Sequence, residues 1–448
     1  MPFARETAFL AELFQSIAGR SRRIIGKPDS RDAAEVLARR LMSSQGEASG
    51  VALADTLLDA YSMMDAPARL RWFETLAGHY GVNDTRLSEA VEAWLADQTP
   101  QAANALHEAA EPRRQELLRR LNLAPGGTAA LVEMRAALLG LLPAHPELQP
   151  VDADFAHLFS SWFNRGFLLL RRIDWSSPAD VLEKIIRYEA VHEINGFEDL
   201  RRRLVPPDRR CFAFFHPRMP DDPLIFVEVA LTRGAPAAIR PLIDNSQPVL
   251  DAETADTAVF YSISNTQAGL RGISFGNFLI KQVVEELARE VPRLRNFVTL
   301  SPLPGFSRWL ESEGPPDGLA SPDWFRNPER REALEPELAA AAARYLVDAK
   351  DASGRPRDPV ARFHLGNGAS LDRINPFADV SPRGLEKSFG VMVNYRYDQA
   401  SIERNHEAYA ASGKVAASAA VRRLAAATRR PSEAKPGEIA KNKTEPKP

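Results

Sequence analysis

The sequence has one cysteine, no excess of either charge and no long apolar run, and each absence excludes a class of protein. A single cysteine, Cys211, cannot form an intrachain disulfide or a cysteine-based zinc site, and it suits a reducing compartment. It lies in the apolar segment Cys211–Phe215, so we expect it in the core. Lysine and arginine total 57 against 59 for aspartate and glutamate, so no global basic excess indicates a nucleic-acid partner.

The sequence also lacks a run of about 18 apolar residues, which predicts no membrane-spanning helix and no membrane partner. The N-terminus has no apolar signal core, and Glu6 and Glu12 within the arginine-bearing residues 3–23 favour a first helix over a transit peptide. We therefore expect a cytoplasmic protein. The chain has 448 residues, which predicts more than one domain.

Residues 1–168 are predicted to be helix after helix. Asp65 followed by Pro67 has the capping residue and early proline that begin a helix, and Asp84 begins another. No strand pattern interrupts this region and no residue in it suggests chemistry, so we expect it to serve packing and oligomerisation. The strongly apolar stretch Asp154–Ile173 is predicted as one more helix, which links this region to the next.

Two β-rich segments follow, Cys211–His216 and Leu224–Thr232, joined by a proline-rich connection. Just before them, Glu189 and His192 have a spacing that places two metal ligands on one helix face. No second such pair is present, and an exposed helix end explains both residues equally well. We therefore predict no metal site.

The most informative segment is residues 257–301. Thr257–Asn265 is apolar and rich in β-formers, Asn277–Glu290 has a helical apolar face, and Asn296–Ser301 is a second short β-rich run. Strand, helix and strand in this order predict a βαβ unit with parallel strands and a right-handed crossover. Parallel strands end at the same edge of a sheet, so the turn after the first strand and Ser301 are predicted to share one edge.

That turn contains two glycines, Gly272 and Gly276, at the start of the helix. Backbone N–H groups at a helix N-terminus favour an anion, and glycine lets a phosphate approach closely, so the turn is a candidate pyrophosphate-binding loop. An ordinary strand–helix turn that uses glycine for its backbone angles would have the same sequence. Spacing alone leaves both interpretations open.

Four segments, FYSISNTQAGLRGISFGNFLIKQVV, LSPLPGFSRWL, DPVARFHLGNGASLDRIN and NYRYD, together resemble the malonyl-CoA decarboxylase family. The resemblance runs in order over roughly Tyr188 to Tyr409, and the N-terminal third matches only as a helical region of the expected size. It implies that RGISFG is the family's version of the CoA-pyrophosphate loop of acetyltransferase-like folds. The loop residues would be Arg271, Gly272, Ile273, Ser274, Phe275, Gly276 and Asn277.

The resemblance implies an α+β fold class with an all-helical N-terminal domain followed by an acetyltransferase-like (GNAT-type) mixed β-sheet domain with flanking helices. We expect the helical domain at 1–168, the CoA-binding catalytic domain at 169–412, and a C-terminal helix and disordered tail at 413–448. The residues from about 169 onward are expected to hold every group that the reaction needs. A homo-oligomer, dimer or tetramer, is expected.

The implied reaction converts malonyl-CoA to acetyl-CoA and carbon dioxide through a thioester enolate, in malonate or fatty acid metabolism. The thioester accepts the electrons released on decarboxylation, so no metal and no cofactor is expected. Two other functions stay open. An acyl-CoA-dependent N-acetyltransferase would share the fold and the loop, and a CoA-sensing scaffold protein would keep the loop without the chemistry.

Three residues match the family's site by resemblance. Ser301 matches the catalytic serine and would engage the malonyl carboxylate, although from the residues alone a serine that caps a proline turn is favoured. His364 matches the catalytic histidine and would donate a proton with a pKa near ~6.5, whereas a lone histidine between Phe363 and Leu365 is otherwise a core residue. Tyr397 would orient the histidine. Ser274 stands where some family members have glutamate, so a carboxylate that orients the histidine is absent from the loop.

Overall fold

The computed structural model describes residues 33–43, 46–244, 248–273, 275, 279–320 and 324–427. The helix predicted within residues 3–23 and the tail predicted from residue 429 lie outside these ranges. The chain divides into two compact units. Unit 1 takes Met1–Leu204, Cys211–Val227 and Ile263–Leu279, and unit 2 takes Val205–Arg210, Glu228–Ser262 and Ile280–Pro448.

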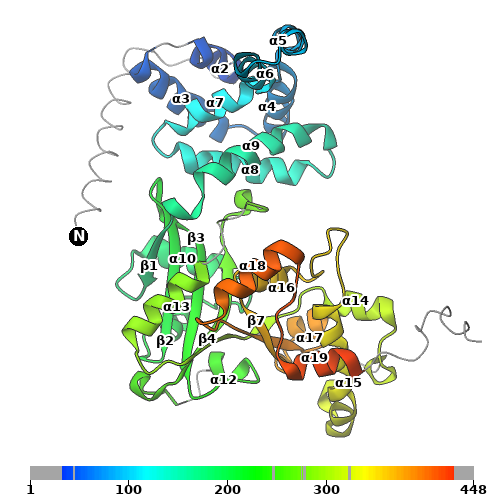
Figure 1. Ribbon diagram of the computed structural model, residues 1–448. Coiled ribbons are helices and arrows are strands. Elements are labelled where there is room, and N and C mark those ends of the chain that lie inside the picture. The colour runs from blue at the N-terminus through cyan, green and yellow to red at the C-terminus, as the bar shows by residue number, and fades with distance from the viewer. Residues whose placement is uncertain are drawn as a thin grey trace, which may run out of the picture. The chain divides into compact units, whose positions relative to one another are not determined.

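The first part of unit 1 is helical, as predicted. Asp65 accepts a hydrogen bond from the Ala68 N–H and begins α4, and α5 begins at Asp84, as predicted, with Asn83 as its capping residue. Helices α8 and α9 lie side by side (Figure 1). The helices are α2 (Ala33–Ser43), α3 (Glu47–Ser62), α4 (Ala66–His79), α5 (Asp84–Ala96), α6 (Pro100–Ala110), α7 (Arg113–Asn122), α8 (Gly127–Leu141) and α9 (Gln149–Trp162).

Two buried arginine–aspartate pairs connect α9 to the helices beside it. Arg114 of α7 pairs with Asp154, and Arg135 of α8 pairs with Asp152 at 2.8 Å. The amide of Gln115 donates a further hydrogen bond to Asp154 at 2.5 Å. Each buried charge is therefore compensated within unit 1, which is the condition for keeping an ion pair in a core.

The predicted helix over Asp154–Ile173 is wrong beyond Trp162. Helix α9 ends there, a 3-10 turn η2 (Arg165–Phe167) follows, and Leu169–Ile173 is strand β1, antiparallel to β2 (Arg209–His216). Asn164 begins the turn by accepting a hydrogen bond from the Gly166 N–H at 3.0 Å. A short apolar run fits a strand as well as a helix, so the Asn-Arg-Gly sequence decides where the helix stops.

The strands form a mixed sheet in the order β1-β2-β3-β4-β5-β8-β6, with β7 paired to β8. Strands β4 and β5 are parallel, as predicted, with Thr257 opposite Asn296 and Phe260 opposite Thr299, and β8 is antiparallel to β5, β6 and β7. Strand β7 was not predicted. The remaining strands are β3 (Met219–Thr232), β4 (Thr257–Asn265), β5 (Asn296–Thr299), β6 (Ser301–Pro302), β7 (Ser370–Asn375) and β8 (Met392–Arg396).

Helices flank the strands in both units, and in unit 2 α15 packs against α19 (Figure 1). The α+β fold class, a helical N-terminal region followed by a mixed sheet with flanking helices, is confirmed. The predicted domain boundary at residue 168 stays a prediction. Unit 1 adds α10 (Ala179–Tyr188) and α11 (Phe197–Leu204). The others are α12 (Arg240–Ile243), α13 (Leu279–Glu290), α14 (Phe306–Glu313), α15 (Pro328–Val347), α16 (Pro359–Gly366), α17 (Pro382–Ser388), α18 (Ile402–Ser412) and α19 (Ala419–Ala427).

In the part of the chain that the structure describes, no helix combines the length and apolar character of a membrane span. No three histidine, cysteine, aspartate or glutamate side chains gather there as a metal site either. Glu189 instead caps the end of α10, where its carboxylate accepts the N–H groups of Val191 and His192 at 2.7 and 2.8 Å. Glu189 therefore lies at a helix end, as expected, whereas His192 is buried and not exposed as the helix-end interpretation required.

Candidate active site

Ser301 lies at the end of the βαβ unit, as predicted. Strand β5 stops at Thr299, Leu300 donates its N–H to the carbonyl of Phe260, and Ser301 begins β6 opposite Val393. The serine is buried, and its hydroxyl oxygen is 3.1 Å from Nε2 of His364. A residue 63 positions away in the sequence therefore meets the serine hydroxyl.

His364 is held in the last turn of α16. Asp358 caps this helix, with Oδ1 accepting the Ala361 N–H at 2.8 Å, and Tyr345 donates its hydroxyl to the other carboxylate oxygen. Burial raises the pKa of the Asp358 carboxyl to about 6, so the cap stays ionised at neutral pH. The helix that carries the histidine is thus fixed at its start by a buried carboxylate.

The imidazole of His364 is fully enclosed, and this changes its titration. Burial lowers the pKa of His364 to about 3, well below the value of about 6.5 expected from the sequence. Among the residues that the structure describes, no anionic partner offsets the desolvation, so the ring is neutral at physiological pH in the free protein. A neutral imidazole has one N–H and one acceptor nitrogen, and their placement decides what the ring can do.

Tyr397 follows β8 directly and meets the other ring nitrogen. Its backbone N–H donates to the carbonyl of Phe297, and its hydroxyl is 2.8 Å from Nδ1 of His364. Burial raises the pKa of Tyr397 well above its usual range, so it stays a neutral phenol. The three predicted residues Ser301, His364 and Tyr397 therefore form one buried hydrogen-bonded chain within unit 2.

The direction of this chain follows from counting donors. Within the described residues the Tyr397 hydroxyl has His364 as its one partner, whereas Ser301 Oγ lies between Nε2 and the Thr299 hydroxyl, 2.9 Å away. If the phenol donates to Nδ1, then Nε2–H donates to Ser301, the serine donates to Thr299, and only the threonine hydrogen lacks an acceptor. The reverse direction would leave the more acidic phenol hydrogen unpaired. The geometry favours an Nε2–H that points at Ser301.

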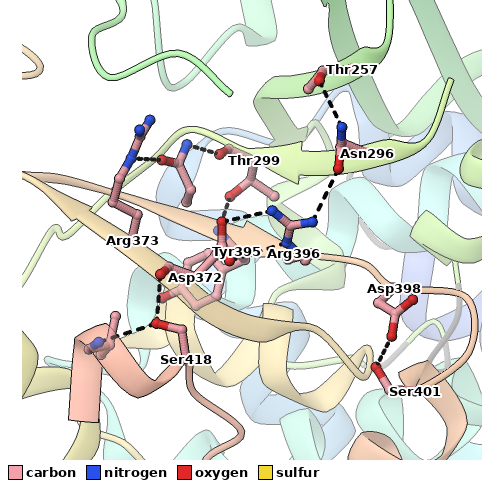
Figure 2. Close-up of polar contacts among 12 residues, drawn as sticks. Thr257, Asn296, Thr299, Asp372, Arg373, Tyr395, Arg396, Asp398, Ser401 and Ser418 are labelled. Carbon is pink, nitrogen blue, oxygen red and sulfur yellow. Dashed lines mark hydrogen bonds and ion pairs between the residues drawn. The ribbon is translucent and has the colours of Figure 1, made fainter. Parts of the chain in front are cut away.

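Two residues of this candidate site, Thr299 and Tyr395, were not predicted from the sequence. The Thr299 hydroxyl accepts the Tyr395 backbone N–H at 3.1 Å (Figure 2). The Tyr395 ring stacks on the His364 imidazole with ring centroids 4.4 Å apart. Each lies two residues before a predicted one, Ser301 or Tyr397. Alternate residues of a strand share a face, so this spacing was the available signal.

Side chains between the strands fix the backbone around the site. Asn394 donates to the Thr299 carbonyl at 2.6 Å and accepts from Arg373. Arg396 pairs with Asp372 and donates to the Asn296 carboxamide at 3.2 Å (Figure 2). These contacts join β5, β7 and β8, so Ser301 and Tyr397 extend from one rigid part of the sheet.

The predicted CoA loop belongs to unit 1. A 3-10 turn, η4 (Ala268–Leu270), follows β4, and the Ile273 N–H donates to the Leu270 carbonyl at 3.0 Å. Gly272 has a φ of +81°, which a residue with a Cβ rarely adopts, so this glycine is required by the turn. Arg271, Gly272, Ile273 and Phe275 are described, whereas the predicted Ser274, Gly276 and Asn277 lie outside the described residues.

Comparison with protein families gives two matches that together span most of the chain. Residues 166–435 match the family described as "Malonyl-CoA decarboxylase C-terminal domain", and residues 80–163 match "Malonyl-CoA decarboxylase N-terminal domain". The first alone covers more than half of the sequence.

Relatives and solved structures agree with these matches. The chain is 36% identical to the mitochondrial malonyl-CoA decarboxylase of Anser anser anser in an alignment of 389 positions, and the match covers 77% of this chain and 77% of that protein. The crystal structure of malonyl-CoA decarboxylase from Rhodopseudomonas palustris has a TM-score of 0.85 and 56% identity, covering 88% of this chain and 100% of that one. The protein from Agrobacterium vitis gives 0.83 and 55%, covering 88% and 99%.

Proposed function

The chain belongs to the malonyl-CoA decarboxylase family of carboxy-lyases, and we propose that it converts malonyl-CoA to acetyl-CoA and carbon dioxide at Ser301, His364 and Tyr397. The observation that carries this assignment of residues is the buried chain from Thr299 to Tyr397 through Ser301 and His364. It supplies hydrogen-bond donors and a titratable ring where water is excluded.

The proposed reaction breaks one carbon–carbon bond. The electron pair of the bond to the carboxylate moves into the thioester carbonyl, carbon dioxide leaves, and an enolate remains. One proton added to the α-carbon then gives acetyl-CoA, so the balance is malonyl-CoA plus one proton to acetyl-CoA plus carbon dioxide. The thioester carbonyl itself accepts the charge, so the step requires no metal ion and no organic cofactor.

We assign Ser301 to the substrate carboxylate. Its hydroxyl receives the His364 Nε2–H, so its own hydrogen is free to turn from Thr299 to an incoming anion. A single hydroxyl donor in a buried site solvates a carboxylate much less well than bulk water does. The bound carboxylate is therefore poorly solvated, which favours its loss as neutral carbon dioxide.

His364 is the proposed proton donor, and substrate binding supplies the condition for it. The free ring is neutral because burial lowers its pKa to about 3. A malonyl carboxylate at Ser301 brings a negative charge beside the ring, which raises the pKa of His364 and stabilises the imidazolium. The Tyr397 hydroxyl suits both states, since a phenol can donate to a neutral Nδ1 and accept from Nδ1–H.

The glycine turn at residues 271–277 is the proposed binding site of the CoA pyrophosphate. Gly272 gives the turn a left-handed residue, and a Cβ built there would meet no atom of the described residues within 4 Å, which supports a position open to a ligand. Exposed N–H groups at the start of a helix are the usual donors to a phosphate. Along the chain this turn follows β4, which pairs with the strand that leads to Ser301.

We further propose a cytoplasmic homo-oligomer with no nucleic-acid partner, in which residues 1–168 serve assembly. The single cysteine is buried, which suits a reducing compartment. Light scattering of the purified protein measures the assembly, and a monomer at micromolar concentration would contradict it. Fractionation of cells that express the native protein tests the compartment.

The deciding assay is release of carbon dioxide from malonyl-CoA by the purified protein, with acetyl-CoA measured in parallel. We expect equal amounts of the two products in wild type and a large loss of both in Ser301→Ala and His364→Asn. Wild-type protein that releases no carbon dioxide would refute the proposed function. An acceptor amine added to the same mixture tests the N-acetyltransferase alternative, which requires acetylated amine to form.

A further inference from the structure

The contact of α8 with the turn at η4 has no place in the proposed chemistry. Both belong to unit 1, and Gly269 lies against the helix so closely that a Cβ on it would stand 1.8 Å from the carbonyl oxygen of Val132. Leu270 beside it is buried. The start of the glycine turn therefore rests directly on the backbone of α8.

One side chain of α8 reaches two carbonyl groups of that turn. Nη1 of Arg135 donates to the Gly269 carbonyl at 2.7 Å and to the Arg271 carbonyl at 3.0 Å. The other edge of the guanidinium binds Asp152 of α9, through Nε at 2.8 Å and Nη2 at 3.5 Å. The Arg135 side chain is only 4% exposed and its charge is compensated by Asp152, so its effect on the turn is through geometry.

The two carbonyl contacts decide where the N–H groups of the turn point. In a trans peptide the C=O and N–H directions are opposite, and the described residues contain no cis peptide. The Arg271 carbonyl points to Arg135, so the Gly272 N–H points to the other side. The structure gives this N–H no acceptor among the described residues. It has the orientation of a free donor that an anion can meet.

We propose that Arg135 is a positioning residue for the CoA-pyrophosphate loop, which makes the helical region part of CoA binding as well as of assembly. This inference rests on the proposed function of the loop. Arg135 fixes the direction of the Gly272 N–H before the ligand binds. Binding therefore does not have to include the free-energy cost of ordering this part of the loop. Arg135 lies outside the range 169–412 that was expected to hold every group the reaction needs.

The test compares two buried arginines in the full-length protein. Arg135→Met removes the support of the loop, whereas Arg114→Met removes the matched ion pair with Asp154 and leaves the loop contacts in place. We expect Arg135→Met to raise the dissociation constant of CoA and the KM for malonyl-CoA by about tenfold, with kcat nearly unchanged. Malonyl-pantetheine lacks the diphosphate, so its kcat/KM should not change. Arg114→Met should lower stability without changing CoA affinity.

Two further variants keep the test decisive if Arg135→Met does not fold. Gly269→Ala forces a Cβ against the Val132 carbonyl, so it disturbs the contact between the turn and α8 from the turn side and should also weaken CoA binding. Arg135→Lys keeps the charge but has fewer donors, so its affinity should lie between wild type and the other variants. Wild-type CoA affinity in Gly269→Ala, or an equal loss in Arg114→Met, would overturn the inference. If calorimetric titration shows that the wild-type protein binds no CoA, the proposed function of the loop itself is overturned.

Discussion

The buried, neutral state of His364 makes a quantitative prediction about stability against pH. The unfolded ring has a pKa of about 6.5 and the folded ring about 3, so between these values the unfolded state binds more protons. A base whose folded-state pKa is depressed contributes stability above its unfolded pKa, and this stability is lost as the pH falls. Integrating the proton difference from pH 7.5 to pH 5 gives a loss of about 2 kcal/mol.

The measurement is urea unfolding of wild type and His364→Asn at both pH values, followed by circular dichroism. The free energy of unfolding of the variant should fall by about 2 kcal/mol less than that of wild type over this range. Groups such as Asp358 and His216, whose folded-state pKa values are also shifted, are present in both proteins and cancel in the difference. Only the histidine contribution remains.

The control is His107→Asn, which changes an exposed histidine on α6 and leaves the buried imidazole of His364 in place, so the loss of about 2 kcal/mol that His364 contributes should remain. The value of about 2 kcal/mol requires only that the folded-state pKa lies well below 5. If wild type and His364→Asn respond equally to pH, then the folded ring titrates normally. The buried neutral imidazole, and with it the requirement for a substrate carboxylate to charge the ring, would be refuted.

Further predictions concern the reaction itself. Ser301→Ala should lower the turnover number by ~10²–10³-fold while calorimetry with CoA gives an unchanged affinity, and lost CoA binding would contradict separate roles. The imidazolium is the proposed acid, so wild-type kcat should fall as the pH rises through the bound-state pKa of His364. This basic limb should be absent from the residual activity of His364→Asn. Tyr397→Phe removes the partner of Nδ1 and should lower kcat by about tenfold with little change in KM. Gly272→Val places a β-branched residue at φ +81° and should weaken CoA binding in a protein that still folds.

The part of the fold that sequence predicted best is the βαβ unit. Its first strand, Thr257–Asn265, has the predicted bounds, and its two strands are parallel because an apolar-faced helix connects them. Periodicity was less informative for short strands. Leu169–Ile173 was assigned to a helix. Ser370–Asn375 received no assignment because its two apolar residues, Leu371 and Ile374, are three positions apart, and a register shift after Leu371 interrupts the strand.

Of the candidate site, the residues that lie in sequence motifs could be predicted from the sequence. Ser301, His364 and Tyr397 each stand in a recognisable segment, and the structure brings them together. The supporting contacts depend on tertiary packing, and sequence cannot supply them. Arg135 contacts a carbonyl 134 positions away through its guanidinium, and nothing in its neighbours along α8 indicates that partner. The pKa of His364 likewise depends on burial that only the folded chain creates.

The hydrogen-bond direction at His364 has a consequence for the reactivity of Ser301. In a hydrolase triad, a carboxylate accepts the Nδ1–H, which leaves Nε2 as a base that makes the serine a nucleophile. In the direction that the donor count favours, a phenol donates to Nδ1 and Nε2 carries the hydrogen, so the neutral ring of the free site has no base that could remove the Ser301 proton. A serine in this state does not attack a carbonyl. The free site therefore differs from a serine hydrolase triad in the direction of its hydrogen bonds, although it too contains a serine and a histidine.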